Sequence, residues 1–318
     1  MAVFPREYGG AMLGDSVDLC TFLRLLGAAD LSVARIIEGH FNAVALVCRY
    51  GSADQVSALA QSVISGALSA VWGADDAHGL HIVEEGRGEK LRGRKVFASG
   101  AGFITRPLVT ATAKDGQTLC LLDLGPDYEF DVSAWQVLGM TATATGSVDL
   151  SGHRISATEI IGKPGDFMRQ PYFSGGAWRF CAAQVGAMER LVDLFRGHLA
   201  STGRGEDQYQ LQKLAHCVTS VKTARFWVEE AAKRLALDSN PQSVVAFANL
   251  TRMVTERCAL DVMENVQRGV GLQAFVRPND VERVSRDLAT YLRQPVPDRA
   301  MSDGARVILD SPLPIGDF

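Results

Sequence analysis

The spacing of apolar residues changes twice along this 318-residue chain, and the change restricts the folds that it can adopt. Before about residue 74 and after about residue 163, apolar residues recur every three or four positions, as in helices packed along one face. Between these segments apolar and polar residues alternate, as in half-buried strands. We therefore predict an α+β fold of three domains: a short helical domain at 1–74, a small antiparallel β domain at 75–162 and a helical bundle at 163–318.

Local signals mark where several of these elements begin. Asp30 can cap a helix, and Ser52–Gln55 has the capping-box sequence that opens another. Residues 114–117 join two strand-like runs as a hairpin, because Asp and Gly tolerate positive φ. Three apolar stripes at helical spacing are predicted to face a core: Val33, Ile37, His40, Val44 and Val47; Leu211, Leu214, Val218, Val221, Val228 and Leu235; and Val244, Phe247, Thr251, Val254, Cys258 and Val262.

Composition and missing motifs exclude several classes of function. The net charge is −4 with no long run of one sign, which argues against nucleic-acid and membrane partners. The N-terminus has no basic region followed by an apolar stretch, and the longest apolar run, 43–48, is too short to cross a bilayer. Six cysteines without a CxxC pair predict reduced thiols and a cytoplasmic location. HExxH, GxGxxG, P-loop and GxSxG motifs are absent, so we predict no metal, no such nucleotide site and no serine-hydrolase elbow.

Residues 135–152, WQVLGMTATATGSVDLSG, combine many hydroxyl groups with few bulky side chains. Threonines suit the edge of a sheet, which is one interpretation of this segment. The other is that small residues let the backbone approach a ligand closely. The substitution Ala144→Val is expected to separate the two, because a strand edge tolerates a β-branched residue.

Four segments, in this order, resemble the acyl-CoA dehydrogenase superfamily: residues 30–52, 91–111, 135–152 and 266–288. They are similar to the family's N-domain helix pair, its G-x-K-x-[WF]-x-[ST] strand, its LGMR-x-[ST]-x-[ST] segment, and its Gln-Gly-rich turn followed by an Arg-Asp pair. The resemblance implies N-terminal helices, a small antiparallel β domain and a C-terminal four-helix bundle. It also implies a bound FAD or FMN and a homodimer or homotetramer.

The resemblance implies roles for individual residues. Phe97 and Ser99 match family positions that lie against the flavin ring, where donors and a flat wall tune its redox behaviour. Gln267, Gly269 and Gly271 match the turn that reaches the adenosine half of a flavin in a neighbouring subunit. The residues expected to bind the substrate are Trp72, Met140, Thr141 and Thr143.

The chain departs from the family pattern at the flavin and at the catalytic base. The loop TE-x-x-x-GSD, which helps to cover the flavin in relatives, is missing from residues 73–94, so we expect the flavin to be held weakly. Relatives remove the substrate's α proton with a Glu. This chain has Arg-Gln-Pro at 293–295 after its Arg-Asp pair, no acid at 175–177, and Thr141 in place of the LGMR arginine. Asp298 is the remaining candidate for a base.

Three features resemble the superfamily branch that uses reduced flavin and oxygen, typified by the dibenzothiophene monooxygenase. They are an F-x-SGA strand at 97–101, a histidine on an N-terminal helix, His40, and an L-[HR]-x-P-V loop at 292–296. Oxygen activation calls for hydrogen-bond donors nearby. We therefore predict that His40, Ser99 and Arg293 are catalytic and converge on one pocket. The plainer interpretations are a core histidine, a strand hydroxyl and a solvated helix-end charge.

Three functions remain open at this stage. The leading hypothesis is a reduced-flavin, O2-dependent monooxygenase acting on a small organic substrate. The first alternative is an acyl-CoA or acyl-thioester dehydrogenase with a non-standard base. The second is a flavin-free homologue with a binding, assembly or other non-redox role.

Overall fold

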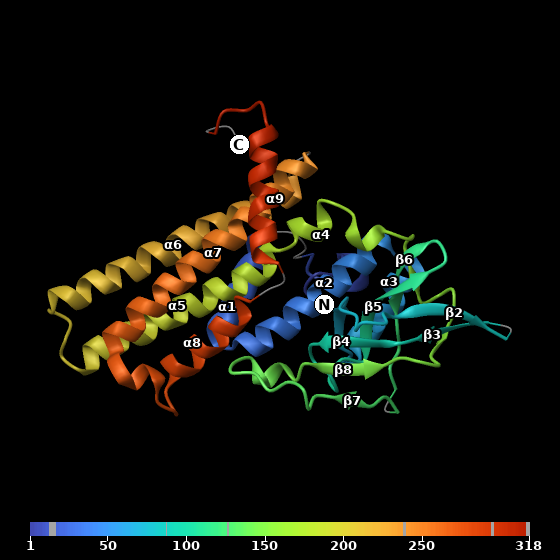
Figure 1. Ribbon diagram of the computed structural model, residues 1–318, viewed down its shortest axis with the longest axis horizontal. Helices are drawn as coiled ribbons and strands as arrows, with labels where there is room; N and C mark the ends of the chain where they lie inside the picture. Colours follow the sequence, from blue (N-terminus) through green and yellow to red (C-terminus); the bar gives the residue numbers. More distant parts are fainter. Residues whose placement is uncertain (13–16, 87, 126, 238–239, 294–295, 316–318) are drawn as a thin grey trace. The chain divides into compact units, whose positions relative to one another are not determined.

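The computed structural model describes residues 1–12, 17–86, 88–125, 127–237, 240–293 and 296–315, and it confirms the predicted order of helices, sheet and helices (Figure 1). Packing gathers the chain into two compact units. The first comprises Met1–Gly14, Arg35–Gln136 and Thr141–Arg169, and the second comprises Asp15–Ala34, Val137–Met140 and Gln170–Phe318. The chain passes between these units several times, so the predicted division at residues 74 and 162 stays a proposal about sequence segments.

Helices α2 (Leu31–Tyr50) and α3 (Ala53–Ile64) begin at the predicted caps. The Asp30 carboxylate accepts hydrogen bonds from the backbone N–H groups of Ser32, at 2.8 Å, and Val33, at 3.0 Å. Ser52 and Gln55 form a complete capping box, in which each side chain accepts from the other residue's backbone N–H. Both helix starts were therefore readable from local sequence.

Helix α2 is buried on more than one side. Within its predicted stripe His40, Val44 and Val47 are buried, but Val33 is exposed because Leu31 and Ala34 fill the first turn's buried side. Length and composition alone would allow α2 to span a membrane, with a mean hydropathy of 1.3. Of that window, 56% is buried inside the protein, so these apolar side chains are used in packing.

The first unit contains two sheets. The larger has the order β10-β6-β5-β2-β3-β9, with β1 (Ser69–Trp72) parallel to β5 (Arg106–Ala113). The smaller has the order β4-β8-β7. The β2–β5 pair is also parallel, and the other described pairs are antiparallel, as predicted. The remaining strands are β2 (His81–Glu85), β3 (Gly88–Arg92), β4 (Arg94–Ala98), β6 (Gly116–Leu121), β7 (Phe130–Asp131), β8 (Gly146–Asp149), β9 (Arg154–Ile155) and β10 (Ile160–Ile161).

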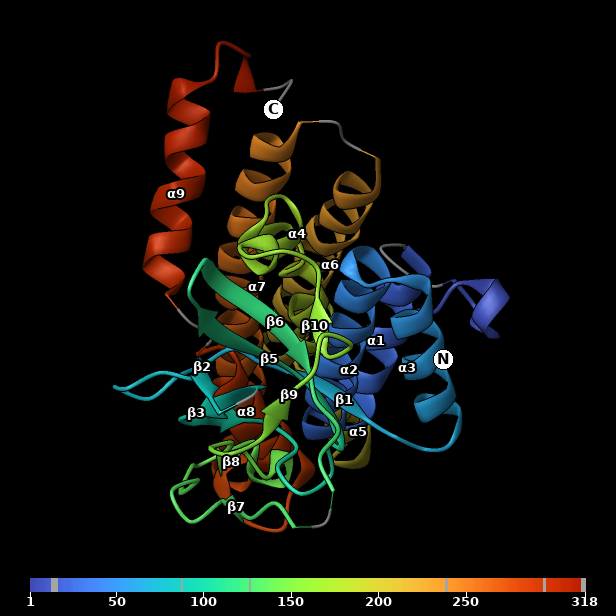
Figure 2. The same cartoon turned by 90° about the vertical axis from the view of Figure 1, so that its right-hand side faces the viewer.

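The predicted hairpin joins β5 to β6 (Figure 2). Ala113 pairs with Gly116, so Lys114 and Asp115 form a two-residue turn, and Gly116 has a φ of 133°. That value lies where only glycine is unstrained. The core of this unit includes Trp72, Leu91, Val109, Cys120, Leu122 and Val148.

The second unit is helical. Its long helices α5 (Trp178–Ser201), α6 (Gln208–Leu237) and α7 (Pro241–Val270) pack along one another (Figure 1). The stripe predicted for α7 is confirmed, with Val254 partly buried and the other members buried. The other helices of this unit are α1 (Val17–Ala29), α4 (Tyr172–Gly175), α8 (Asp280–Tyr291) and α9 (Pro297–Asp310).

The stripe predicted for α6 is wrong in its first half. Leu211 and Val218 are 44% and 42% exposed, whereas Val221, Val228 and Leu235 are buried. This helix carries apolar residues on two faces, and periodicity alone does not indicate which face packs. The buried face of its first half is formed by Gln210, Cys217, Val221 and Ala224.

None of the six cysteines, all of which the structure describes, forms a disulfide, in agreement with the predicted reduced thiols. Burial raises the pKa of Cys20 and Cys120 to about 12, so both thiols stay protonated and unreactive. In the part of the chain that the structure describes, no group of three or more His, Cys, Asp or Glu side chains is placed to hold a metal ion.

Glycines allow α1 and α5 to pack closely within the second unit. A Cβ added at Gly186 would lie 1.9 Å from the carbonyl oxygen of Arg24, and one at Gly27 would lie 1.9 Å from that of Ala183. Gly197 lies on α5 as well, but among the described residues nothing beyond its own helix backbone and chain neighbours comes within 4 Å of such a Cβ. Gly186 and Gly197 therefore form a matched pair.

We expect Gly186→Ala to lower the free energy of unfolding by at least about 2 kcal/mol, because backbone must move to admit the methyl group. Gly197→Ala should leave that free energy unchanged or raise it by up to about 1 kcal/mol, because alanine favours a helix. Urea unfolding followed by circular dichroism measures both variants. Equal midpoints would contradict the close packing of α1 on α5.

Candidate functional site

A bulge in β4 places Phe97 in a strained conformation. Arg94 and Lys95 pair with Asp149 and Val148 of β8, but the register then shifts by one residue before Ala98 reaches Gly146. Within the bulge, Phe97 has a φ of 50° and its side chain is 69% exposed. A left-handed conformation costs a residue with a Cβ about 1–2 kcal/mol. An aromatic ring held outward at this cost is a candidate wall for a ligand.

The buried ammonium of Lys95 anchors the strand at this bulge. Its Nζ lies 2.5 Å from Oδ1 of Asp75 and 2.9 Å from Oγ1 of Thr110, and its side chain has no exposed surface. Thr110 in turn donates to the carbonyl oxygen of Gly73 at 3.3 Å. Burial lowers the pKa of Lys95, and the bond and charge of Asp75 oppose that shift. Lys95 occupies the lysine position of the G-x-K-x-[WF]-x-[ST] motif, and the sequence alone indicated no role for it.

A chain of hydroxyl groups lies beside the bulge. Oγ1 of Thr145 donates to Oγ of Ser99 at 3.2 Å, and it lies 2.9 Å from Oγ1 of Thr143. Both threonines are buried, and Ser99 is half-buried. The backbone N–H of Gly100 donates to the carbonyl oxygen of Thr143 at 2.8 Å. The hydroxyl-rich segment thus packs against the strand that carries Phe97 and Ser99.

The hydroxyl-rich segment is a strand only from Gly146 onward. Thr141–Thr143 form a short 3-10 turn, Ala144 has a φ of 42°, and β8 starts only at Gly146. Thr141 is exposed, whereas Thr143 is buried within the hydroxyl chain. Ala144→Val therefore cannot distinguish a strand edge from a ligand-binding segment, because a β-branched residue is disfavoured at positive φ in both cases.

Trp72 supports Ser99 from within the core. Its indole Nε1 donates to the carbonyl oxygen of Ser99 at 3.1 Å, and its ring packs edge-on against Phe130 with centroids 6.1 Å apart. Trp72 is buried, so the structure gives it a supporting position. Its predicted contact with a substrate stays a prediction.

His40 is a buried, neutral histidine. Its Nδ1 accepts a hydrogen bond from the backbone N–H of Ser69 at 3.1 Å, which leaves the ring proton on Nε2. Burial, followed by the charge of the N-terminus, lowers its pKa to about 4. His40 contacts the start of β1, and Trp72 at the end of β1 contacts Ser99. At neutral pH His40 is thus a hydrogen-bond donor and not a proton source.

In the second unit the Arg-Asp pair of α8 holds the LGM segment. Asp287 accepts from the backbone N–H of Met140 at 2.7 Å, and Arg286 donates to the carbonyl oxygen of Leu138 at 2.9 Å. Met140 has a φ of 59°. A Cβ on Gly139 would lie 2.2 Å from the carbonyl oxygen of Arg286, which explains the glycine. The family signature thus has a physical role that its sequence alone did not indicate.

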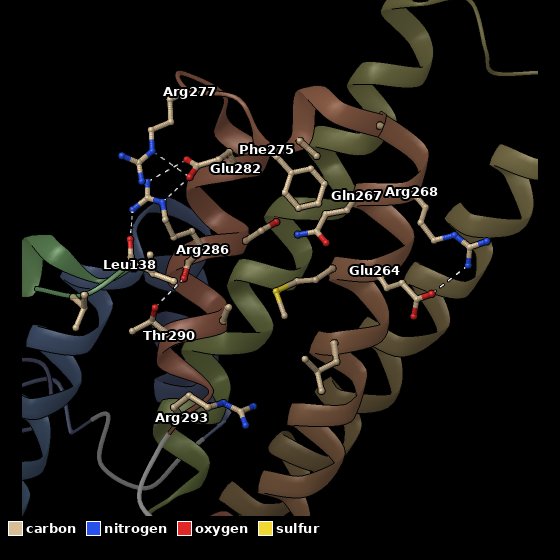
Figure 3. A pocket seen from close by; sticks show the side chains of 17 residues that line it. Leu138, Glu264, Gln267, Arg268, Phe275, Arg277, Glu282, Arg286, Thr290 and Arg293 are labelled. Atoms are coloured by element: carbon tan, nitrogen blue, oxygen red, sulfur yellow. Dashed lines mark hydrogen bonds and ion pairs between the residues drawn. The ribbon is translucent and has the colours of Figure 1, made fainter.

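A cavity of about 1060 Å³ lies among α7, η4 (Gly271–Phe275) and α8 of the second unit (Figure 3). Two predicted cofactor residues, Gln267 and Gly271, line it together with Arg293. Gly269 does not line this cavity: a Cβ there would lie 2.3 Å from the ring of Phe195. The small residue at that position is explained by helix packing.

Arg293 is paired rather than free. Its Nη2 forms an ion pair with Glu256 of α7, and its side chain is 57% exposed. Gln294 and Pro295 of the predicted loop lie outside the described residues. Asp298 is exposed in the first turn of α9. The predicted convergence of Arg293 with His40 and Ser99 stays a prediction, since Arg293 belongs to the second unit and the other two to the first.

The carboxylates that line the cavity are both bound to arginines. Glu264 pairs with Arg268 at 3.2 Å, and Glu282 pairs with Arg286 at 2.7 Å and with Arg277 at 3.3 Å (Figure 3). The bond to Arg286 lowers the pKa of Glu282. Glu282 is poorly suited to remove a proton from carbon, because its arginine partners stabilise the ionised form.

Comparison with known proteins agrees with this architecture. Residues 167–292 match the model of the acyl-CoA dehydrogenase C-terminal domain. Mitochondrial isobutyryl-CoA dehydrogenase of Dictyostelium discoideum is 24% identical over 311 residues, covering 91% of this chain and 74% of that protein. The resemblance to the acyl-CoA dehydrogenase superfamily is confirmed.

Solved structures of the superfamily fold match nearly the whole chain. FMN-bound TdsC from Paenibacillus sp. A11-2 superposes with a TM-score of 0.87 at 19% identity, covering 98% of this chain and 88% of that one. Methanesulfinate monooxygenase MsuC from Pseudomonas fluorescens superposes with a TM-score of 0.84 at 18% identity, covering 99% and 88%. Butyryl-CoA dehydrogenase from Megasphaera elsdenii superposes with a TM-score of 0.85 at 18% identity, covering 97% and 86%, which confirms the predicted acyl-CoA dehydrogenase-like fold.

The buried state of His40 predicts a pH dependence of stability. The pKa is 6.5 for an ordinary histidine and about 4 here, so the unfolded chain binds more protons between these values. The stability that depends on a neutral His40 is complete above pH 6.5 and is lost as pH falls toward 4, by at most about 1.4 kcal/mol per pH unit. His40→Asn, which keeps an acceptor for Ser69, should flatten this slope in urea unfolding. The exposed His216→Asn serves as the control; an unchanged slope in His40→Asn would refute the assignment.

The positive φ of Ala144 gives a second prediction. Ala144→Gly should leave the free energy of unfolding unchanged or raise it by up to about 1 kcal/mol, because glycine adopts this φ freely. Ala144→Val should lower it by at least about 1 kcal/mol. Thermal unfolding ranks the variants, and a valine variant as stable as the glycine variant would show that the backbone is not strained here.

Proposed function

We propose that this protein is a flavin-dependent oxidoreductase, and within that class a reduced-flavin, O2-dependent monooxygenase of a small organic substrate. The observation that carries the proposal is the bulge that exposes Phe97 beside the Ser99 hydroxyl. The same fold occurs in a structure that binds FMN and in a methanesulfinate monooxygenase.

The residues at the bulge fit a flavin. Phe97 offers an exposed flat ring, and Ser99 offers a hydroxyl at half-buried depth, which are the wall and the donor that a flavin ring needs. Monooxygenation places one oxygen atom of O2 in the substrate and the other in water, with an electron pair supplied by reduced flavin. In this proposal Phe97 packs on the ring, and Ser99 and neutral His40 supply hydrogen bonds to oxygen or substrate. The catalytic role of Arg293 stays a prediction from the sequence.

FAD and FMN are both compatible with the chain. The cavity of the second unit has Gln267, Gly271 and Arg268 on its lining, and these would hold the distal half of an FAD from a neighbouring subunit. The exposed apolar face of α6, with Leu211, Val218 and Phe226, supports a homodimer or homotetramer. The six free thiols favour the cytoplasm as the compartment.

An acyl-thioester dehydrogenase is the second candidate, favoured by the similarity to isobutyryl-CoA dehydrogenase. It needs a base, and exposed Asp298 is the candidate that the sequence offers. Reduction of the flavin by an acyl-CoA under anaerobic conditions, abolished in Asp298→Asn, would favour this reading. A flavin-free role, motivated by the missing cover loop, predicts no flavin absorbance after flavin is added.

Phe97 provides the direct test of a flavin wall. Phe97→Ala should weaken FMN binding about tenfold in a fluorescence titration, because an aromatic contact and its buried area are lost. Phe103, also exposed and six residues further along, provides the matched control, and Phe103→Ala should change affinity less than twofold. Equal effects of the two substitutions would contradict the wall. Failure of the unmodified protein to bind FMN or FAD would reject the proposed function.

A further inference from the structure

We infer that Thr143 and Thr145 are positioning residues that fix Ser99 as a hydrogen-bond donor toward the ligand. The inference rests on the proposed function, because it assumes that Ser99 faces the flavin or the substrate. It concerns residues that are themselves buried and reach the ligand only through Ser99.

The direction of donation follows from counting protons. Each hydroxyl has one proton to donate and two lone pairs to accept. Thr145 gives its proton to Ser99 Oγ at 3.2 Å, so the 2.9 Å contact between Thr143 and Thr145 must use the proton of Thr143. All three dipoles then point the same way. The proton of Ser99 is left directed away from Thr145, toward whatever occupies the half-exposed side of this residue.

The backbone holds this chain in place. Ser99 accepts from the Trp72 indole through its carbonyl oxygen at 3.1 Å, so its main chain is fixed from the core side. Gly100 donates to the carbonyl oxygen of Thr143 at 2.8 Å, and Ala101 donates to that of Ala144 at 3.1 Å. The two segments therefore cannot slide past one another without breaking several hydrogen bonds. A donor fixed in this way loses little entropy when a ligand binds.

The alignment has a chemical consequence. In a buried, poorly screened environment, successive hydrogen bonds polarise one another, so a hydroxyl that accepts from a donor chain is itself a stronger donor. Ser99 should accordingly prefer acceptors that carry partial negative charge. A flavin gains electron density at its ring nitrogens and oxygens on reduction. The hydroxyl chain is therefore expected to favour reduced over oxidised flavin.

The test is a double-mutant cycle between Ser99 and Thr145, measured as the Kd of FMN in its oxidised and dithionite-reduced forms. Ser99→Ala should weaken binding of reduced FMN about tenfold, and Thr145→Val about threefold to fivefold, with smaller effects on oxidised FMN. In the Ser99→Ala background, Thr145→Val should have no further effect. Thr145→Ser, which keeps the hydroxyl, should restore the wild-type Kd.

Controls separate positioning from general loss of structure. Thr118→Val replaces another buried threonine of the same unit and should change neither Kd. If Thr145→Val fails to fold, Thr143→Val interrupts the hydroxyl chain one hydrogen bond earlier and is measured in the same cycle.

The possible outcomes decide between the inference and the proposed function. If Thr145→Val weakens binding equally in the wild-type and Ser99→Ala backgrounds, the threonine acts on structure and the inference fails. If Ser99→Ala weakens binding but both threonine variants bind normally, the inference fails while the flavin site stands. If Ser99→Ala leaves binding of both flavin forms unchanged, the proposed position of Ser99 is itself wrong.

Discussion

The geometry of the candidate site depends on the ion pair between buried Lys95 and Asp75, which is partly exposed. Lys95 has its ammonium fully inside the first unit, bound to Asp75 and Thr110, at the residue where β4 leaves its regular register with β8. Removing Asp75 would cost up to about 3–5 kcal/mol, because the buried ammonium of Lys95 would lose its counter-charge. That amount exceeds the roughly 1–2 kcal/mol by which Phe97 is strained. The ion pair can therefore hold the bulge in place, and the bulge turns Phe97 outward and sets Ser99 against the threonine hydroxyls.

Along the hydroxyl-rich segment, too, strained residues lie beside interactions that fix the backbone. Met140 and Ala144 both have positive φ, and each lies next to a hydrogen bond that fixes the chain: Asp287 binds the N–H of Met140, and Ala101 binds the carbonyl oxygen of Ala144. Strained residues persist where their surroundings determine the backbone more strongly than local preference does. Phe97, Met140 and Ala144 belong to the two segments that the sequence connected with a flavin. The strain thus supports a functional interpretation, although Phe, Met and Ala are not residue types that signal a positive φ.

Local structure was predictable from the sequence, whereas contacts between residues far apart in the sequence were not. The capping box at Ser52 and the β5–β6 hairpin follow from interactions within a few residues. The buried stripe of α7 follows from its single apolar face at helical spacing. The exposure of Leu211 and Val218 depends on which of two apolar faces of α6 meets the bundle. Gly269 is a predicted cofactor residue, yet a larger side chain there would clash with the ring of Phe195, which is distant in sequence. Arg293 likewise has a partner, Glu256, that no spacing rule connects to it. The residues at the site were found through the family resemblance, whereas their hydrogen bonds required the fold.

Glu282 of the second unit and His40 of the first both have lowered pKa values, which makes each a poor proton acceptor at neutral pH. Glu282 is held ionised by Arg286 and Arg277, so it has little tendency to take up a proton. His40, with a pKa near 4, is equally poor at accepting one at neutral pH. A dehydrogenase needs a group that removes a proton from carbon, and neither of these residues meets that requirement. Both are suited to other tasks, since neutral His40 donates from Nε2 and the arginines that hold Glu282 are themselves donors. Under the proposed function, neutral His40 would therefore serve as a hydrogen-bond donor to oxygen that gains negative charge and not as a base.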